Sequence, residues 1–78
     1  MTQQQAERII GTLQRDHKLF KLVGYQCQPD GALFVTFEKI NISLVTIAGW
    51  IDMAGACSQR VGVEGQGDNE VMYASIKL

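Results

Sequence analysis

Hydrophobic and polar positions follow a helical period near the start of the chain. The apolar residues that share this period are Ala6, Ile9, Ile10 and Leu13. Thr2 lies three residues before Gln5, which is the spacing of a capping box in which each side chain satisfies a free backbone amide. The pattern predicts a helix that starts after Thr2, ends near Asp16 and buries one face.

The next segment changes to the alternating pattern that is typical of β-strands. Residues 18–28 and 32–39 are rich in β-branched and aromatic side chains. The sequence QPDG at residues 28–31 supplies the fixed proline angle and the permissive glycine of a tight turn. Because so short a connection joins only antiparallel neighbours, we expect these two segments to form a hairpin.

The second half of the chain repeats this order of patterns. A helix capped by Asn41 or Ser43 is expected to run to about residue 56. Its sheet-facing stripe would consist of Leu44, Ile47, Ala48 and Ile51. The β-branched Val45 and Thr46 disfavour a helix, so a strand is the alternative for this segment. Residues 58–65 and 70–78 have strand patterns, with the turn sequence QGDN between them.

The two halves also resemble each other at an offset of 38 residues. The identical residues that this offset pairs include Ile9 with Ile47, Gly11 with Gly49, Val23 with Val61 and Asp30 with Asp68. The same offset superposes the predicted helices and the predicted turns. It therefore favours an internal duplication, with repeats at residues 1–40 and 41–78.

Together these elements predict a single α+β domain over residues 1–78, in the order αββαββ. We expect a two-layer sandwich in which a four-stranded antiparallel sheet carries both helices on one face.

Strand alternation and the 38-residue offset assign the sheet residues to two faces. The face beneath the helices is expected to hold Val23, Tyr25, Cys27, Leu33, Val35, Phe37, Val61, Val63, Val71 and Tyr73. The opposite face is expected to hold Phe20, Leu22, Phe34, Thr36, Arg60, Met72, Ala74, Ile76 and Leu78. A face in contact with water would be polar at most of these positions, so the pattern predicts an apolar surface that a partner covers. The alternative is a one-residue error in strand register, which exchanges the faces.

Composition and charge exclude several classes of partner. The chain is 46% hydrophobic and 19% charged, with a net charge of −1, so it is expected to fold and to have no broad positive field for nucleic acid. No apolar run approaches the ~18 residues that span a bilayer, and no basic segment precedes an apolar one. With only Cys27 and Cys57, we expect free thiols, a cytoplasmic protein and no membrane partner.

Few residues in the chain suggest catalytic chemistry. His17 is the only histidine, and the two cysteines lack the close paired spacing of a zinc site. Cys27 is expected in the core, where a thiol is normally inert. We therefore expect no enzyme activity, no catalytic residue, no metal and no cofactor.

The remaining apolar residues indicate a binding role. We expect a small protein-binding module, such as an adaptor, assembly factor or inhibitor of the kind that phages and mobile elements carry, acting as a homodimer. Its expected interface residues are Phe20, Leu22, Phe34, Val45, Trp50, Met53, Arg60, Met72 and Ile76. The alternative is a small-ligand binder or minor enzyme with a pocket at a subunit or repeat interface. Its polar groups would come from His17, Tyr25, Arg60 and Tyr73.

Overall fold

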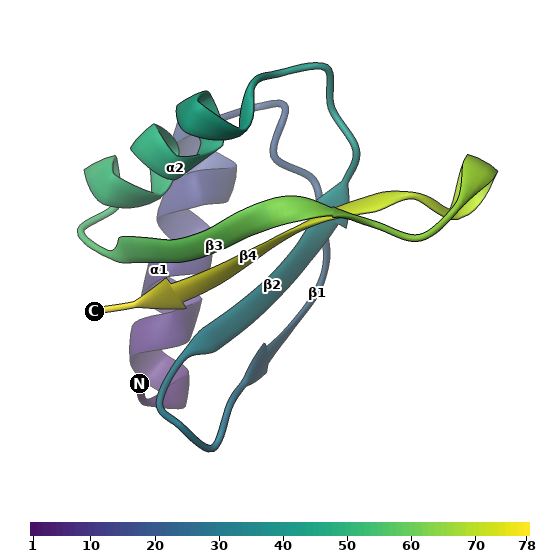
Figure 1. Ribbon diagram of the computed structural model, residues 1–78. Helices are drawn as coiled ribbons and strands as arrows, with labels where there is room; N and C mark the ends of the chain where they lie inside the picture. The colour runs from purple at the N-terminus through teal and green to yellow at the C-terminus, as the bar shows by residue number, and fades with distance from the viewer.

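The computed structural model describes residues 1–78 and confirms the α+β class and the predicted order of elements. Its elements are α1 (Gln3–Asp16), β1 (Leu22–Cys27), β2 (Leu33–Glu38), α2 (Leu44–Met53), β3 (Cys57–Glu64), the short 3₁₀ helix η1 (Gly67–Asn69) and β4 (Val71–Lys77). The four strands form one antiparallel sheet in the order β1-β2-β4-β3. Both helices lie on the same side of this sheet (Figure 1), as the sequence pattern predicts. We call the uncovered side of the sheet the open face.

Local side-chain signals define the helix ends. The capping box is formed, with Gln5 N donating to Thr2 Oγ1 at 3.1 Å and Thr2 N donating to Gln5 Oε1 at 2.8 Å. Ser43, rather than Asn41, caps α2 by accepting from Thr46 N at 3.2 Å. The helix formed here rules out the strand alternative. Neither helix combines the length and the apolar character needed to cross a membrane.

A glycine ends α2 three residues earlier than expected. Gly55 has a φ of 84°, in the left-handed region that side chains disfavour. In this conformation Ala56 N donates to Ile51 O and Gly55 N donates to Asp52 O, which completes a Schellman motif. The chain then turns directly into β3.

The first predicted strand begins too early, because a turn precedes it. Phe20 N donates to His17 O at 2.9 Å, so the segment between α1 and β1 is a tight turn and β1 starts at Leu22. The turn directs Phe20 into the core, where its ring lies 4.7 Å from that of Phe37. The expectation that Phe20 lies on the open face is wrong.

A β-bulge in each outer strand changes which side chains face the helices. In β1, Leu22 pairs with Phe37 and Gly24 pairs with Thr36, so Val23 is an extra residue, 59% exposed. In β3, the same irregularity makes Gln59 the extra residue between Ser58 and Arg60. Leu22, expected on the open face, consequently packs against the core, and Val23 does not.

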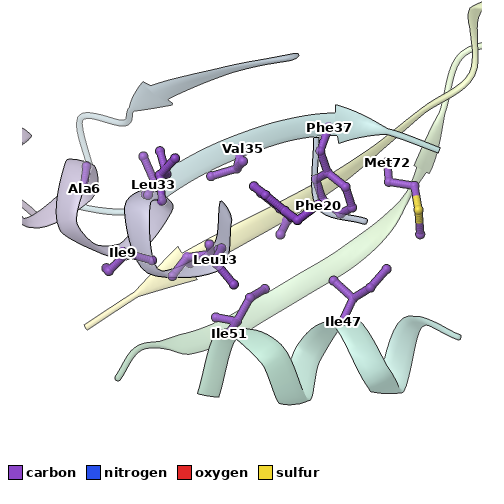
Figure 2. Packing of buried hydrophobic residues seen from close by; sticks show 13 residues of the cluster. Ala6, Ile9, Leu13, Phe20, Leu33, Val35, Phe37, Ile47, Ile51 and Met72 are labelled. Atoms are coloured by element: carbon purple, nitrogen blue, oxygen red, sulfur yellow. The ribbon is translucent and has the colours of Figure 1, made fainter. Parts of the chain in front are cut away.

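The core is formed between the sheet and the two helices. Figure 2 shows Ile47 and Ile51 of α2 directed toward the strands, with Ile9 and Leu13 of α1 beside them. The buried strand residues are Leu33, Val35 and Phe37 of β2 and Met72, Ala74 and Ile76 of β4.

The β4 residues correct the predicted faces. Met72, Ala74 and Ile76 were expected on the open face but are 2%, 1% and 0% exposed beneath the helices. Val71 and Tyr73, expected in the core, lie on the open face. The two sides of the sheet are therefore not equally apolar.

The structure does not show an internal duplication. The strand order is symmetric about the central β2–β4 pair, but the 38-residue offset does not superpose equivalent positions. It pairs buried Leu33 with Val71 and buried Val35 with Tyr73, which lie on opposite faces of the sheet. An even offset fails here because core residues are odd-numbered in β2 and even-numbered in β4.

Candidate functional site

The first candidate surface is the outer face of α2, which we define by Val45, Gly49 and Met53. These residues lie four apart and so form one row along the helix, on the side away from Ile47 and Ile51. Val45 is 83% exposed and Met53 is 80% exposed. A Cβ added to Gly49 would meet no atom within 4 Å, so the row has a gap at its centre.

The outer face of α2 differs in kind from the exposed side of α1. Asp52 is the only charged side chain in α2. The exposed side of α1, in contrast, carries charged and amide residues, namely Gln4, Glu7, Arg8, Gln14 and Arg15. Water therefore solvates α1 well, whereas α2 presents apolar atoms to it.

Trp50 lies beside this surface, but its side chain packs against another residue of the same chain. Its indole stacks on the imidazole of His17, with ring centroids 4.3 Å apart and an angle of 9° between the planes. Both side chains are half-buried. The contact joins the end of α1 to α2, which gives the only histidine and the only tryptophan a packing role.

The second candidate surface is the open face of the sheet. Phe34 of β2 and Tyr73 of β4 lie on it, with ring centroids 5.6 Å apart and planes 21° apart. We call this pair the aromatic shelf. The side chains around it are mostly polar, namely Gln26, Thr36, Glu38, Arg60, Glu64, Ser75 and Lys77.

A hollow of about 700 Å³ lies beside the aromatic shelf. Phe34 and Tyr73 form its apolar wall, and Arg60 of β3 contributes the only cation. The turn after β1 supplies Gln28 and Asp30, among other lining residues. Phe34 also lines a smaller hollow of about 230 Å³ over β1, so its ring separates two depressions of the open face.

The structure divides the expected interface residues among three places. Val45 and Met53 are exposed on α2, with Trp50 half-buried beside them, and Phe34 and Arg60 lie on the open face. The others pack in or against the core, namely Phe20, Leu22, Met72 and Ile76. The expected interface residues that remain accessible therefore form two separate surfaces, one on α2 and one on the open face, rather than one continuous apolar face.

The four polar groups of the alternative ligand site are also separated. Arg60 and Tyr73 line the same hollow. Tyr25 packs on the helix side, where its Oη accepts from Gln3 Nε2 at 2.8 Å, and His17 stacks on Trp50. Only half of that set can act together.

The sequence interpretation missed Tyr73 as a surface residue, although β4 contains a signal for it. Ser75 and Lys77 alternate with Ala74 and Ile76, so polarity within the strand assigns Tyr73 to the open face. The 38-residue offset had placed Tyr73 in the core.

The charged groups form only two ion pairs. Lys39 pairs with Glu70. Arg15 Nε donates to Asp16 Oδ1 at 3.0 Å, and this hydrogen bond raises the pKa of Arg15 and lowers the pKa of Asp16. No group of three or more His, Cys, Asp or Glu residues is placed to hold a metal ion.

The two cysteines are free thiols on opposite outer strands. Cys27 ends β1 and Cys57 begins β3, three interstrand steps of about 4.8 Å away. A disulfide needs Cα atoms within about 7 Å, so the two residues cannot be joined within one folded chain.

Comparison with protein families, with curated proteins and with solved structures finds no match to this chain. The arguments for function therefore depend on the two surfaces themselves.

Proposed function

We propose that this protein is a small non-catalytic binding module that self-associates through the outer face of α2. The observation that carries the proposal is the exposure of Val45 and Met53, at 83% and 80%, on a helix with one charged residue. Burying such side chains on association is favourable, at about 25 cal/mol per Å² of apolar surface.

The spacing of the row suits a second copy of the same chain. Val45 and Met53 lie four residues before and four residues after Gly49. If two copies of α2 cross antiparallel at Gly49, Val45 of each copy meets Met53 of the other, as a twofold interface requires. The missing side chain at Gly49 lets the two backbones approach at the crossing.

Charge also favours self-association. The net charge is −1, so two copies repel each other little, and the outer face of α2 offers no cation to an acidic partner. A ten-residue helix gives less contact than the ~800 Å² per partner of a standard interface. We therefore expect a weak dimer that dissociates on dilution.

The proposal narrows the expected interface to α2, because Met72 and Ile76 of the predicted sheet interface lie in the core. We place the module in the cytoplasm, a reducing compartment that suits its two free thiols. An adaptor, an assembly factor or an inhibitor would each use such a surface.

Sedimentation equilibrium over a range of micromolar concentrations tests the proposal. The average mass should rise from 8.6 kDa toward twice that value, and Val45→Lys with Met53→Lys should hold it at 8.6 kDa. Gln14→Lys on the exposed side of α1 is the matched control and should still dimerise.

A second variant distinguishes an effect on dimerisation from an effect on folding stability. Gly49→Ala should stabilise the isolated helix by about 0.5–1 kcal/mol, because alanine is the better helix former, while the added methyl group weakens the crossing. A wild-type chain that stays monomeric at high micromolar concentration, or an unaffected double lysine variant, would contradict self-association through α2.

A further inference from the structure

The aromatic shelf on the open face is fixed in place by its neighbours. The ring of Tyr73 lies across Gly62 of β3, where an added Cβ would be 2.7 Å from Tyr73 Oη. The absence of a side chain at residue 62 therefore leaves room for this ring over β3. Both rings are half-buried by these contacts, and each keeps part of its surface exposed.

Arg60 stands beside the shelf with its charge unpaired. It is cross-strand partner to Ser75, and Gly62 is partner to Tyr73, so Arg60 and Tyr73 are diagonal neighbours on the same face. The side chain of Arg60 takes part in neither ion pair of the molecule and donates no hydrogen bond. Its guanidinium is available for a planar, bidentate contact with an anion.

The hollow that joins these groups has a suitable size and mixture of walls. Its volume of about 700 Å³ lies within the ~300–1,000 Å³ range of small-molecule sites. Gln28, Gln59 and Ser75 add neutral polar groups around the cation, and Asp30 already uses Oδ1 to accept from Ala32 N at 3.0 Å. The hollow thus combines an aromatic wall with one unpaired cation, Arg60, and one carboxylate, Asp30, which the backbone amide of Ala32 holds.

We propose that this hollow binds a small planar aromatic molecule that carries an anionic group. The ring of the ligand stacks on the exposed part of the aromatic shelf, and its carboxylate or phosphate pairs with Arg60. Phe34 comes from the first half of the chain, and Arg60 and Tyr73 come from the second. The site lies on the opposite side of the sheet from the helices, so it does not depend on α2 or on self-association.

The charges of the open face favour a small anion over a nucleic acid strand. Glu38 and Glu64, with Asp30 in the hollow, offset Arg60 and Lys77 across this face. A polyphosphate backbone needs a continuous positive groove, which this balance does not provide. One anionic group beside one ring needs only Arg60 and the shelf.

Two matched pairs of probes test the site, namely AMP with adenosine and indole-3-acetate with indole-3-acetamide. Each is titrated into ¹⁵N-labelled protein, and the amide shifts of Phe34, Arg60 and Tyr73 report binding. We expect the anionic member of at least one pair to bind roughly tenfold more tightly than its neutral partner. Which pair binds separates a phosphate ligand from a carboxylate ligand.

Three variants assign the groups. Arg60→Gln should remove the preference for the anion, and Tyr73→Ala should weaken both members of the pair by roughly tenfold. Lys77→Gln, on the same face outside the hollow, should change neither. Three results would overturn the site: no shift at these amides with any probe at millimolar concentration, an unchanged anion preference in Arg60→Gln, or binding of a single-stranded oligonucleotide without any small probe.

Discussion

His17 and Trp50 stack almost face to face, with ring centroids 4.3 Å apart and planes inclined by 9°. His17 follows the last residue of α1, and Trp50 lies in the last turn of α2. The pair therefore holds the end of one helix against the other. It also covers one side of an indole that would otherwise add to the apolar surface of α2.

Removal of the imidazole should expose this indole to water. We expect His17→Ala to shift the fluorescence of Trp50, the only tryptophan, to longer wavelength and to lower stability by about 1 kcal/mol. His17→Phe keeps an aromatic ring in place and should retain the wild-type emission. Identical spectra for His17→Ala and the wild type would show that the two rings do not stack in solution.

The observed orientation of β4 predicts how substitutions on its two faces affect stability. Ile76 is fully buried, so Ile76→Val should lower the free energy of unfolding by about 1 kcal/mol, or several degrees in Tm. Ser75→Ala changes the neighbouring residue on the open face and should alter stability by less than about 0.5 kcal/mol. Urea denaturation of the two variants measures both values. A larger loss from Ser75→Ala would restore the original assignment of the faces.

Two glycines should respond to alanine with opposite signs. Gly65 has a φ of 94°, and an added Cβ would lie 2.4 Å from Asn69 O, so Gly65→Ala should cost about 1–3 kcal/mol. Gly11 lies inside α1 with nothing within 4 Å, so Gly11→Ala should stabilise by about 0.5–1 kcal/mol. Thermal unfolding followed by circular dichroism compares them. A stabilising Gly65→Ala would contradict the geometry of the β3–β4 connection.

The ion pair between Arg15 and Asp16 at the end of α1 predicts a lowered pKa for Asp16. The hydrogen bond from Arg15 keeps the pKa of Asp16 below its ordinary value, so Arg15→Ala should raise it. Because the folded-state pKa is the lower one, the contribution of this carboxylate is complete above the unfolded pKa and is lost as pH falls through the folded value. Side-chain ¹³C NMR measures the pKa directly. Arg8→Ala on the same helix is the control and should leave Asp16 unchanged.

The elements could be predicted from the sequence because their signals are local. Thr2 and Gln5 lie within one helical turn, and the turn at residues 28–31 depends on one proline and one glycine. Ser43 likewise caps α2 through an amide three residues away. Such signals act over a few residues, so they survive without knowledge of the tertiary structure.

The faces could not be predicted in the same way, because bulges carry no local signal here. Val23 and Gln59 are each an extra residue with no partner on the neighbouring strand. Such an extra residue shifts the alternation of the strand, so the residues before it face the side opposite to the one that regular alternation predicts. The apparent repeat then transferred the assignment of Leu33 and Val35 to Val71 and Tyr73. The polar Ser75 within β4 was the better guide.

The candidate surfaces were predicted only in part, because one of them depends on contacts between strands. Val45 and Met53 follow directly from the helical period of α2. The aromatic shelf depends on Tyr73 meeting Phe34 across the β2–β4 pair, and on Gly62 leaving space for the ring. That meeting requires the strand order, which the sequence pattern alone does not specify.

The bulges at Val23 and Gln59 also affect whether the sheets of different molecules can associate edge to edge. Both lie in the outermost strands, where a straight row of unpaired amides would act as a template for further chains and for cross-β fibres. Each extra residue bends its strand and so interrupts the row of unpaired amides at both edges of the sheet. The two bulges therefore disfavour lateral polymerisation through the edges of the sheet.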